Sequence, residues 1–132
     1  MGEILPKLLL IEDDKQLAEM YAKKFHRNGY DVTLAKDGQK GFEKAHAESF
    51  DVIVLDLMLP GISGVEVLEM IRMDKKTALT PIIVYTNYND PKNKERCLTY
   101  GADEFILKVD TDPEGLCQTI NRVLTEKKIE KI

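Results

Sequence analysis

Short apolar runs alternate with amphipathic stretches five times along this chain, and the alternation predicts its elements. The apolar runs are rich in valine, isoleucine and leucine, as in parallel strands that are buried on both faces. After each run, apolar residues recur at helical spacing, so a helix is expected to follow every strand. The predicted strands cover residues 7–11, 30–35, 51–55, 82–85 and 104–107.

Capping residues mark where the predicted helices begin and end. Ser63-Gly64-Val65-Glu66 matches a capping box. Asp90-Pro91 and Asp112-Pro113 each place proline in a first helical turn, where proline is tolerated best. Gly29 and Gly101 follow amphipathic stretches, where a left-handed residue commonly ends a helix. The first helix is expected to bury Leu17, Met20, Tyr21 and Phe25, and the last helix Leu116, Ile120, Val123 and Leu124.

Alternating strands and helices imply an α/β fold in which helices cover both faces of a parallel sheet. Right-handed crossovers leave few doubly wound orders, and five strands favour the flavodoxin-like order 2-1-3-4-5 with five helices. The length of 132 residues fits a single domain, expected over residues 1–132 with its core at about 7–126. Residues 127–132 are lysine-rich and are expected to form a tail or the start of a linker.

Composition narrows the classes of function. The net charge of −4 argues against direct nucleic-acid binding. No apolar run approaches the length of a membrane span and no signal-peptide pattern precedes Lys7, so no membrane contact is expected. Cys97 and Cys117 lie in helix-like stretches without the spacing of metal ligands. They are expected to stay reduced, as in a cytoplasmic protein.

Candidate chemistry lies where two of the predicted strands end. Asp56 directly follows Val52–Leu55, and Glu12-Asp13 directly follows Leu8–Ile11. Open α/β sheets bind ligands at the carboxyl ends of their strands, so these carboxylates are expected to share one crevice. Like charges that lie close together repel, and each becomes harder to ionise. A divalent cation commonly neutralises such a cluster.

Each of these residues also has a plainer interpretation when it is taken alone. Glu12-Asp13 would suit a solvated turn, and Asp56 would suit a surface turn. Asp14 is either a further ligand or, as we favour, the cap of the first helix. Thr86 and Lys108 follow strands as many solvent-facing residues do. The joint placement of these residues on one edge of the sheet is what favours a functional site.

Four segments, each at the end of a predicted strand, occur in a characteristic order. They are Leu-Leu-Ile-Glu-Asp-Asp at 9–14, Leu-Asp-Leu-Met-Leu-Pro-Gly at 55–61, Val-Tyr-Thr at 84–86 and Gly-Ala-Asp-Glu-Phe-Ile-Leu-Lys at 101–108. Through these segments the chain resembles the CheY-like receiver domains of two-component response regulators. The resemblance runs from Lys7 to about Leu124. No segment is decisive alone, but their joint occurrence is specific.

The resemblance implies a phosphoacceptor site. Asp56 would be the nucleophile, because a carboxylate that attacks phosphorus forms an acyl phosphate. Lys108 would pair with Asp56 and later with a phosphoryl oxygen. The implied cofactor is Mg²⁺, for which Mn²⁺ can substitute. The implied metal ligands are Asp13, Asp56, the backbone carbonyl of Met58 and Glu12, the last directly or through water.

The resemblance also implies a conformational switch and a set of partners. The Thr86 hydroxyl would bond a phosphoryl oxygen, and the space that it leaves would let Phe105 turn inward. This change would bias the surface formed by the helix from Pro91, strand 104–107 and the helix from Pro113. The implied phosphoryl donor is a sensor histidine kinase or a histidine phosphotransfer protein. The implied partner of the surface is a downstream target, an effector domain or, on phosphorylation, a second copy of the chain.

The chain departs from the family pattern at two positions. Val109 follows Lys108 where the family usually has a proline in a cis peptide, so a trans peptide or a strained loop is expected. Asn87 follows Thr86 where the family usually has a small residue. The larger side chain would narrow access to the phosphoacceptor, and Met58 and Tyr88 flank the same site. Slow autodephosphorylation is therefore expected.

Two other classes of function were weighed against this one. A hydrolase of the haloacid-dehalogenase type also forms an aspartyl phosphate, but it needs a second aspartate two residues after the nucleophile, where this chain has Met58. A receiver-like binding module that has lost phosphorylation is the other alternative, and Val109 and Asn87 are the residues that favour it. We expect a signalling domain that catalyses only its own phosphorylation and dephosphorylation, not an enzyme that turns over a separate substrate.

Overall fold

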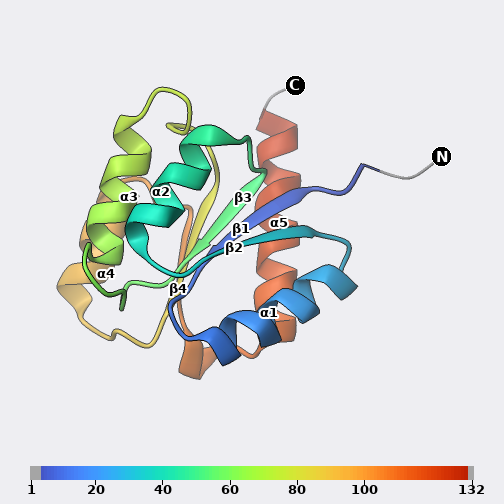
Figure 1. Ribbon diagram of the computed structural model, residues 1–132, viewed down its shortest axis with the longest axis horizontal. Coiled ribbons are helices and arrows are strands. Elements are labelled where there is room, and N and C mark those ends of the chain that lie inside the picture. The colour runs from blue at the N-terminus through green and yellow to red at the C-terminus, as the bar shows by residue number, and fades with distance from the viewer. Residues whose placement is uncertain (1–3, 131–132) are drawn as a thin grey trace.

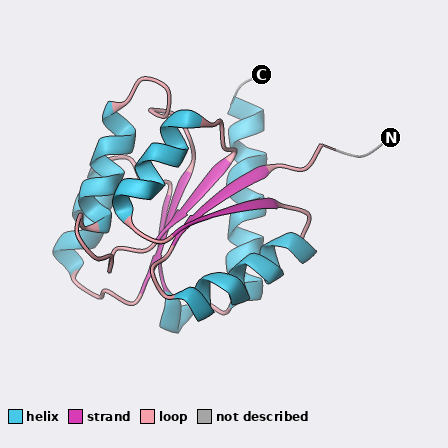
Figure 2. Ribbon diagram, viewed as in Figure 1, coloured by secondary structure: helices cyan, strands magenta, loops and turns pink. Residues whose placement is uncertain are grey.

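A computed structural model describes residues 4–130 and shows a five-stranded parallel sheet in the order β2-β1-β3-β4-β5 (Figures 1 and 2). The strands are β1 (Lys7–Ile11), β2 (Asp31–Ala35), β3 (Val52–Leu55), β4 (Ile82–Thr86) and β5 (Glu104–Leu107). The helices are α1 (Lys15–Arg27), α2 (Gly38–Ala47), α3 (Gly64–Met73), α4 (Pro91–Thr99), the 3-10 helix η1 (Lys108–Asp110) and α5 (Pro113–Glu130). The predicted fold class and strand order are therefore confirmed.

Helices cover both faces of the sheet, and each face has its own apolar core (Figure 1). Successive residues of a strand point to opposite faces, so one apolar run supplies both cores. In β3, Ile53 and Leu55 pack with α2, α3 and α4, whereas Val52 and Val54 pack with α1 and α5. This two-sided burial explains why the central strands read as unbroken apolar runs.

The capping signals act as the sequence predicts. The Asp14 carboxylate accepts from the backbone N–H of Leu17, which makes Asp14 the N-cap of α1. The Ser63 hydroxyl likewise accepts from the backbone N–H of Glu66. Gly29 and Gly101 have φ values of +91° and +97°, the left-handed conformation that glycine adopts without strain. Local sequence therefore fixes these helix ends.

Several predictions about individual positions were wrong. Met20 was expected in the buried stripe of α1 but is 45% exposed, because the neighbouring Tyr21 occupies the core side of the helix instead. Strand β2 begins at Asp31 and not at Tyr30, whose backbone N–H bonds the Phe25 carbonyl in the turn after α1. Leu17 and Leu124 are only partly buried against the core of their face, and β3 begins at Val52 and not at Asp51.

The end of the chain departs from the expected core boundary. Helix α5 continues to Glu130, beyond the expected core limit at about residue 126. Residues 131 and 132 of the expected tail lie outside the described part of the chain. Across residues 4–130, no helix combines the length and the apolar character that crossing a bilayer requires. Cys97 and Cys117 are free thiols, buried in the cores of opposite faces.

The start of α3 lies unusually close to the loop that follows β3. A Cβ atom added at Gly64 would lie 2.4 Å from both the Asp56 carbonyl oxygen and the Leu57 Cα. The Gly64 N–H also donates to the Leu57 carbonyl at 3.1 Å. Both close neighbours are backbone atoms, which cannot rotate away as a side chain can. The absence of a side chain at Gly64 therefore sets how closely α3 approaches Asp56.

Gly64→Ala is expected to destabilise the fold by about 1–3 kcal/mol, the usual cost of forcing an extra methyl group into packed structure. The free energy of unfolding, measured by urea denaturation, checks this. Met73→Ala at the exposed end of α3 is the matched control and should lie within about 0.5 kcal/mol of the wild type. Equal stability of Gly64→Ala and the wild type would show that the loop after β3 gives way freely.

Candidate functional site

Two adjacent strands end at the same level and bring the predicted carboxylates together. Strand β1 pairs with β3 in a register that places Ile11 beside Leu55, so the residues that follow them emerge side by side. The Asp56 N–H donates to the Ile11 carbonyl at 3.1 Å, which continues the ladder one step past β3. Glu12 and Asp56 are thus fixed by the sheet itself and not by a mobile loop.

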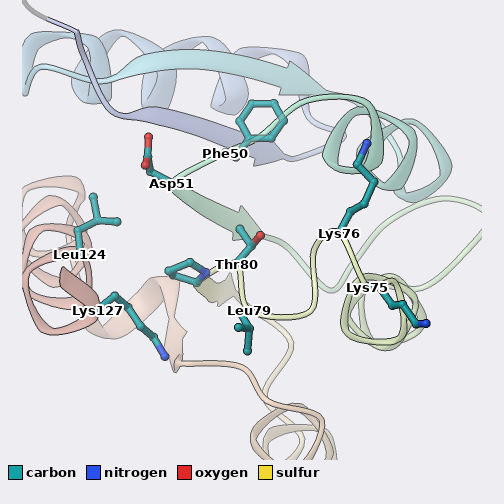
Figure 3. A pocket seen from close by; sticks show the side chains of 9 residues that line it. Phe50, Asp51, Lys75, Lys76, Leu79, Thr80, Leu124 and Lys127 are labelled. Atoms are coloured by element: carbon teal, nitrogen blue, oxygen red, sulfur yellow. The ribbon is translucent and has the colours of Figure 1, made fainter. Parts of the chain in front are cut away.

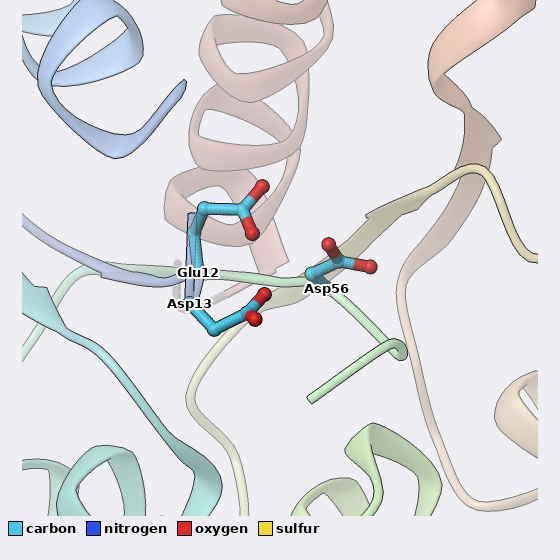
Figure 4. Close-up of side chains that lie close together, drawn as sticks. All are labelled: Glu12, Asp13 and Asp56. Carbon is cyan, nitrogen blue, oxygen red and sulfur yellow. The ribbon is translucent and has the colours of Figure 1, made fainter. Parts of the chain in front are cut away.

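Glu12, Asp13 and Asp56 form one acidic cluster (Figure 4). Each offers a carboxylate oxygen, and these oxygens all lie within 4.8 Å of one another. Glu12 and Asp56 are only 4% and 7% exposed, whereas Asp13 is exposed. Two of the charges are therefore held away from water, and the third faces it.

Lys108 supplies the positive charge of the cluster. Its ammonium lies 2.6 Å from Glu12 Oε1 and 3.2 Å from Asp56 Oδ2, and its side chain is 10% exposed. The Lys108–Glu12 contact was not predicted from the sequence, which pointed only to Asp56. Three carboxylates still face one ammonium. The cluster keeps an excess of negative charge that a divalent cation would neutralise.

The two buried ion-pair partners respond to this environment in opposite ways. Burial raises the pKa of Glu12, the nearby Asp56 charge adds to the rise, and Lys108 opposes it. Burial alone would lower the pKa of Lys108, but its ion pairs with Glu12 and Asp56 outweigh burial and raise that pKa. Lys108 therefore stays protonated at neutral pH, and the pKa of Glu12 lies above its ordinary value.

Asp56 is surrounded by hydrogen-bond donors. Its Oδ1 accepts from the Thr86 hydroxyl at 2.7 Å and from the Met58 N–H at 3.1 Å, and Lys108 bonds its Oδ2. Thr86 is fully buried, and its own oxygen accepts from the Tyr88 N–H at 3.1 Å. Thr86 therefore already bonds Asp56 directly, an arrangement that the sequence did not reveal.

The remaining predicted residues lie around this centre. The Met58 side chain is exposed, while its backbone is held against Asp56. Phe105, opposite Val84 in the β4–β5 register, is partly buried on the face covered by α2, α3 and α4. Asn87 and Tyr88 are exposed beside the site. No peptide bond between residues 4 and 130 is cis, as the valine after Lys108 led us to expect. Lys108 begins η1, a short helix that the sequence did not predict.

A hollow at the opposite edge of the sheet lies away from the acidic cluster. It measures about 370 Å³ and lies among residues that precede β3 and β4, together with the last turns of α5 (Figure 3). Its lining combines Phe50 and Leu124 with Lys75 and Lys76. The acidic cluster lies at the carboxyl ends of the strands, where α/β sheets bind their ligands.

Lys108→Met is expected to destabilise the protein by about 3 kcal/mol at pH 7, because it leaves two buried carboxylates without their counter-ion. The raised pKa of Glu12 means that the folded state binds a proton more tightly than the unfolded state does, so lowering the pH favours folding. Removing Lys108, which opposes this rise, leaves Glu12 with a still higher pKa, so the loss should be smaller at about pH 5 than at pH 7.

Urea unfolding of both proteins at the two pH values provides the measurement. Lys40→Met, an exposed lysine of α2, is the matched control and should change stability little at either pH. A loss that is equally large at both pH values would contradict the assignment of Glu12 as the group that protonates.

Comparison with known proteins agrees with this geometry. The response regulator receiver domain family matches residues 8–121. The response regulator ArlR of Staphylococcus saprophyticus is 40% identical over 120 residues, which are 91% of this chain and 53% of that protein. ArlR of Staphylococcus aureus (strain Mu50) is 38% identical with the same coverage. The chain therefore spans about half the length of the curated relatives it matches.

Solved structures match over nearly the whole chain. A CheY-like receiver domain protein from Methanospirillum hungatei superposes with a TM-score of 0.90 at 28% identity, covering 96% of this chain and 99% of that one. The receiver domain of a sensor histidine kinase from Pseudomonas aeruginosa, solved with a magnesium ion in its active-site cleft, has a TM-score of 0.83 at 25% identity, with coverages of 92% and 99%. By sequence and by fold, this chain belongs to the response regulator receiver domain family.

Proposed function

We propose that this domain accepts a phosphoryl group on Asp56 and passes the resulting change to a partner. The donor is a phosphohistidine of a sensor kinase or of a phosphotransfer protein. The observation that carries the proposal is the set of contacts to Asp56, whose buried carboxylate meets the Lys108 ammonium, the Thr86 hydroxyl and the Met58 N–H. Every one of these groups is a donor that would equally serve phosphoryl oxygens.

The donor set of the acidic cluster fits Mg²⁺. Its ligand atoms are all oxygens, which Mg²⁺ and Mn²⁺ prefer, and exposed Asp13 leaves one side open to the waters that Mg²⁺ retains. Glu12, Asp13, Asp56 and the Met58 carbonyl are the ligands that we assign. When bound, the ion neutralises charge between the incoming phosphoryl oxygens and the carboxylates.

The protein groups carry out the transfer around that ion. A carboxylate oxygen of Asp56 forms a bond to phosphorus while the bond from phosphorus to the donor's imidazole nitrogen breaks, and that nitrogen keeps the electron pair. Lys108 exchanges a carboxylate contact for a phosphoryl oxygen, and it stays charged throughout because its pKa is raised. The domain modifies itself and releases no separate product apart from the dephosphorylated donor.

The switch that we propose begins at Thr86. Its hydroxyl moves from Asp56 Oδ1 to a phosphoryl oxygen, and Phe105 turns toward the vacated space. Phe105 lines a hollow of about 500 Å³ between α4 and β5, so this side chain is not tightly enclosed on its outer side. The moving elements are those of the α4–β5–α5 surface, which would meet a target, an effector domain or a second copy of the chain.

The proposal includes a single domain over residues 1–132 and a cytoplasmic location, where kinases of this type present their phosphohistidine. Two free, buried cysteines agree with a reducing compartment. The curated relatives are about twice as long as this chain. We therefore assign the signalling response to the target or effector domain that the α4–β5–α5 surface would bind. Direct contact with nucleic acid or with a membrane is not part of the proposal.

Incubation with phosphoramidate is expected to add one phosphoryl group to the protein, measured as intact mass. The addition should require Mg²⁺ and should disappear in Asp56→Asn or with a chelator. Asp31→Asn, which alters an exposed aspartate at the start of β2, is the matched control and should react like the wild type. An unmodified but folded wild type would contradict the proposal and favour a receiver that works without phosphorylation.

The same measurement, continued after donor removal, gives the lifetime of the phosphoryl group. We expect it to last for minutes or longer, because Asp56 is buried and the exposed side chains of Met58, Asn87 and Tyr88 crowd its approach. Hydrolysis that finishes within seconds would show that water reaches the site freely.

Phe105→Ala is expected to accept phosphoryl groups within about twofold of the wild-type rate, because the groups that bond the Asp56 carboxylate come from Met58, Thr86 and Lys108. The variant is expected to lose the response of the α4–β5–α5 surface. Amide shifts on phosphorylation, followed by NMR, are the measurement. In the wild type they should extend into α4, and in Phe105→Ala they should stay near Asp56. Ile106→Ala, on the opposite face of β5, is the control. If the amide shifts spread as far in Phe105→Ala as in the wild type, the proposed switch would be wrong.

A further inference from the structure

The Lys108 ammonium has three N–H groups, and only two have oxygen partners among residues 4–130. Those partners are Glu12 and Asp56. The backbone that carries Lys108 does little to fix it, since η1 has no buried residue and the following Val109 is 78% exposed. Something other than the local chain must therefore hold the ammonium at the acidic edge.

Two aromatic rings occupy the remaining side of the ammonium. Its nitrogen lies 5.8 Å from the ring centroid of Tyr21 and 5.8 Å from that of Tyr85. Tyr21 comes from α1 and Tyr85 from β4, and both rings are buried in the same core. The rings meet edge to face, with centroids 5.5 Å apart and planes 80° apart. They form a continuous wall that offers the ammonium π-faces and no ionised oxygen.

The hydroxyl of Tyr85 has a hydrogen-bond partner of its own. It donates to the Thr111 carbonyl at 2.9 Å, just beyond η1. Burial raises the pKa of Tyr85, so the hydroxyl stays neutral and keeps this bond. The ring of Tyr85 thus contacts the ammonium while its hydroxyl ties the loop after Lys108. The two contacts can be separated by substitution.

We propose that Tyr21 and Tyr85 are positioning residues for Lys108, and that their rings confine its ammonium to the carboxylate edge. The role rests on the phosphoacceptor function proposed above. A buried cation needs compensation on every side, and a second anion there would hold Lys108 away from an incoming phosphoryl group. The rings stabilise the charge without offering such a competitor. The ammonium therefore has only carboxylate or phosphoryl oxygens as ionic partners.

Paired substitutions test the rings separately from the hydroxyls. Tyr21→Leu and Tyr85→Leu keep an apolar side chain but remove the π-face, whereas Tyr21→Phe and Tyr85→Phe keep it. At saturating phosphoramidate and Mg²⁺, each Leu variant should phosphorylate about tenfold more slowly, as loss of a desolvated cation–π contact implies. The Phe variants should stay within about twofold of the wild type. Equal slowing in Leu and Phe variants would overturn the proposal, because the hydroxyl would then be the active part.

A double-mutant cycle separates positioning from packing. The destabilisation by Tyr85→Leu, measured by urea unfolding, should be smaller in a Lys108→Met background than in the wild type, because only the wild type also loses the contact with the ammonium. Equal destabilisation in both backgrounds would mean that Tyr85 only fills space, and the proposal would be wrong. The cycle needs no phosphorylation. If the wild type accepts no phosphoryl group, the function proposed for Asp56 fails, while the cycle still reports whether the ring supports Lys108.

Discussion

The ion pairs of Lys108 with Glu12 and Asp56 are the contacts on which the site depends. Two carboxylates that are almost fully buried would repel each other and lose hydration, and each is costly without a counter-ion. The lysine follows β5, and the carboxylates follow β1 and β3, so the pairs also join the end of β5 to the middle of the sheet. Folding and the charge state of the site are therefore coupled.

The parallel sheet lets these charges lie close together without placing any of them inside the apolar cores. All strands end on one edge, so the charged groups gather there while the strands behind them bury unbroken apolar runs in two cores. Gly64 lets α3 start against the loop after β3, and Arg72 of α3 donates to the Gly101 and Thr80 carbonyls around the opposite ends of β4 and β5. Helix α3 lies on one face of the sheet and thus contacts the backbone at both ends of its strands.

Much of the fold follows from patterns that the sequence carries locally. These patterns act over only a few residues, so they could be predicted. They are the apolar runs of the strands, the N-caps at Asp14 and Ser63 and the left-handed glycines at 29 and 101. The exposure of Met20 could not be predicted, because Tyr21 lies beside it on the helix and only packing decides which of the two side chains faces the core. The acidic cluster was predictable for a different reason: strand ends share an edge whatever the register.

Finer features of the site depend on register, which the sequence does not determine. Lys108 bonds Glu12 as well as Asp56 because of how far β5 extends along β4. The same register sets Tyr85 beside Ile106, on the face from which Lys108 reaches the edge, and α1 brings Tyr21 to that face. A one-residue slip would turn these side chains to the other face of the sheet. Their neighbourhood therefore appears only once the strands are aligned.

The hydrogen bonds of Thr86 limit how the domain can respond to a new group on Asp56. Its O–H group donates to Asp56 and its oxygen accepts from the Tyr88 N–H, so Thr86 links the site to the segment that leads into α4. Thr86 is fully buried, and the hydroxyl has little room to move alone. In the switch proposed above, a group on Asp56 that draws this hydroxyl would pull on its bond with the Tyr88 N–H, so the segment that leads into α4 would respond together with β5.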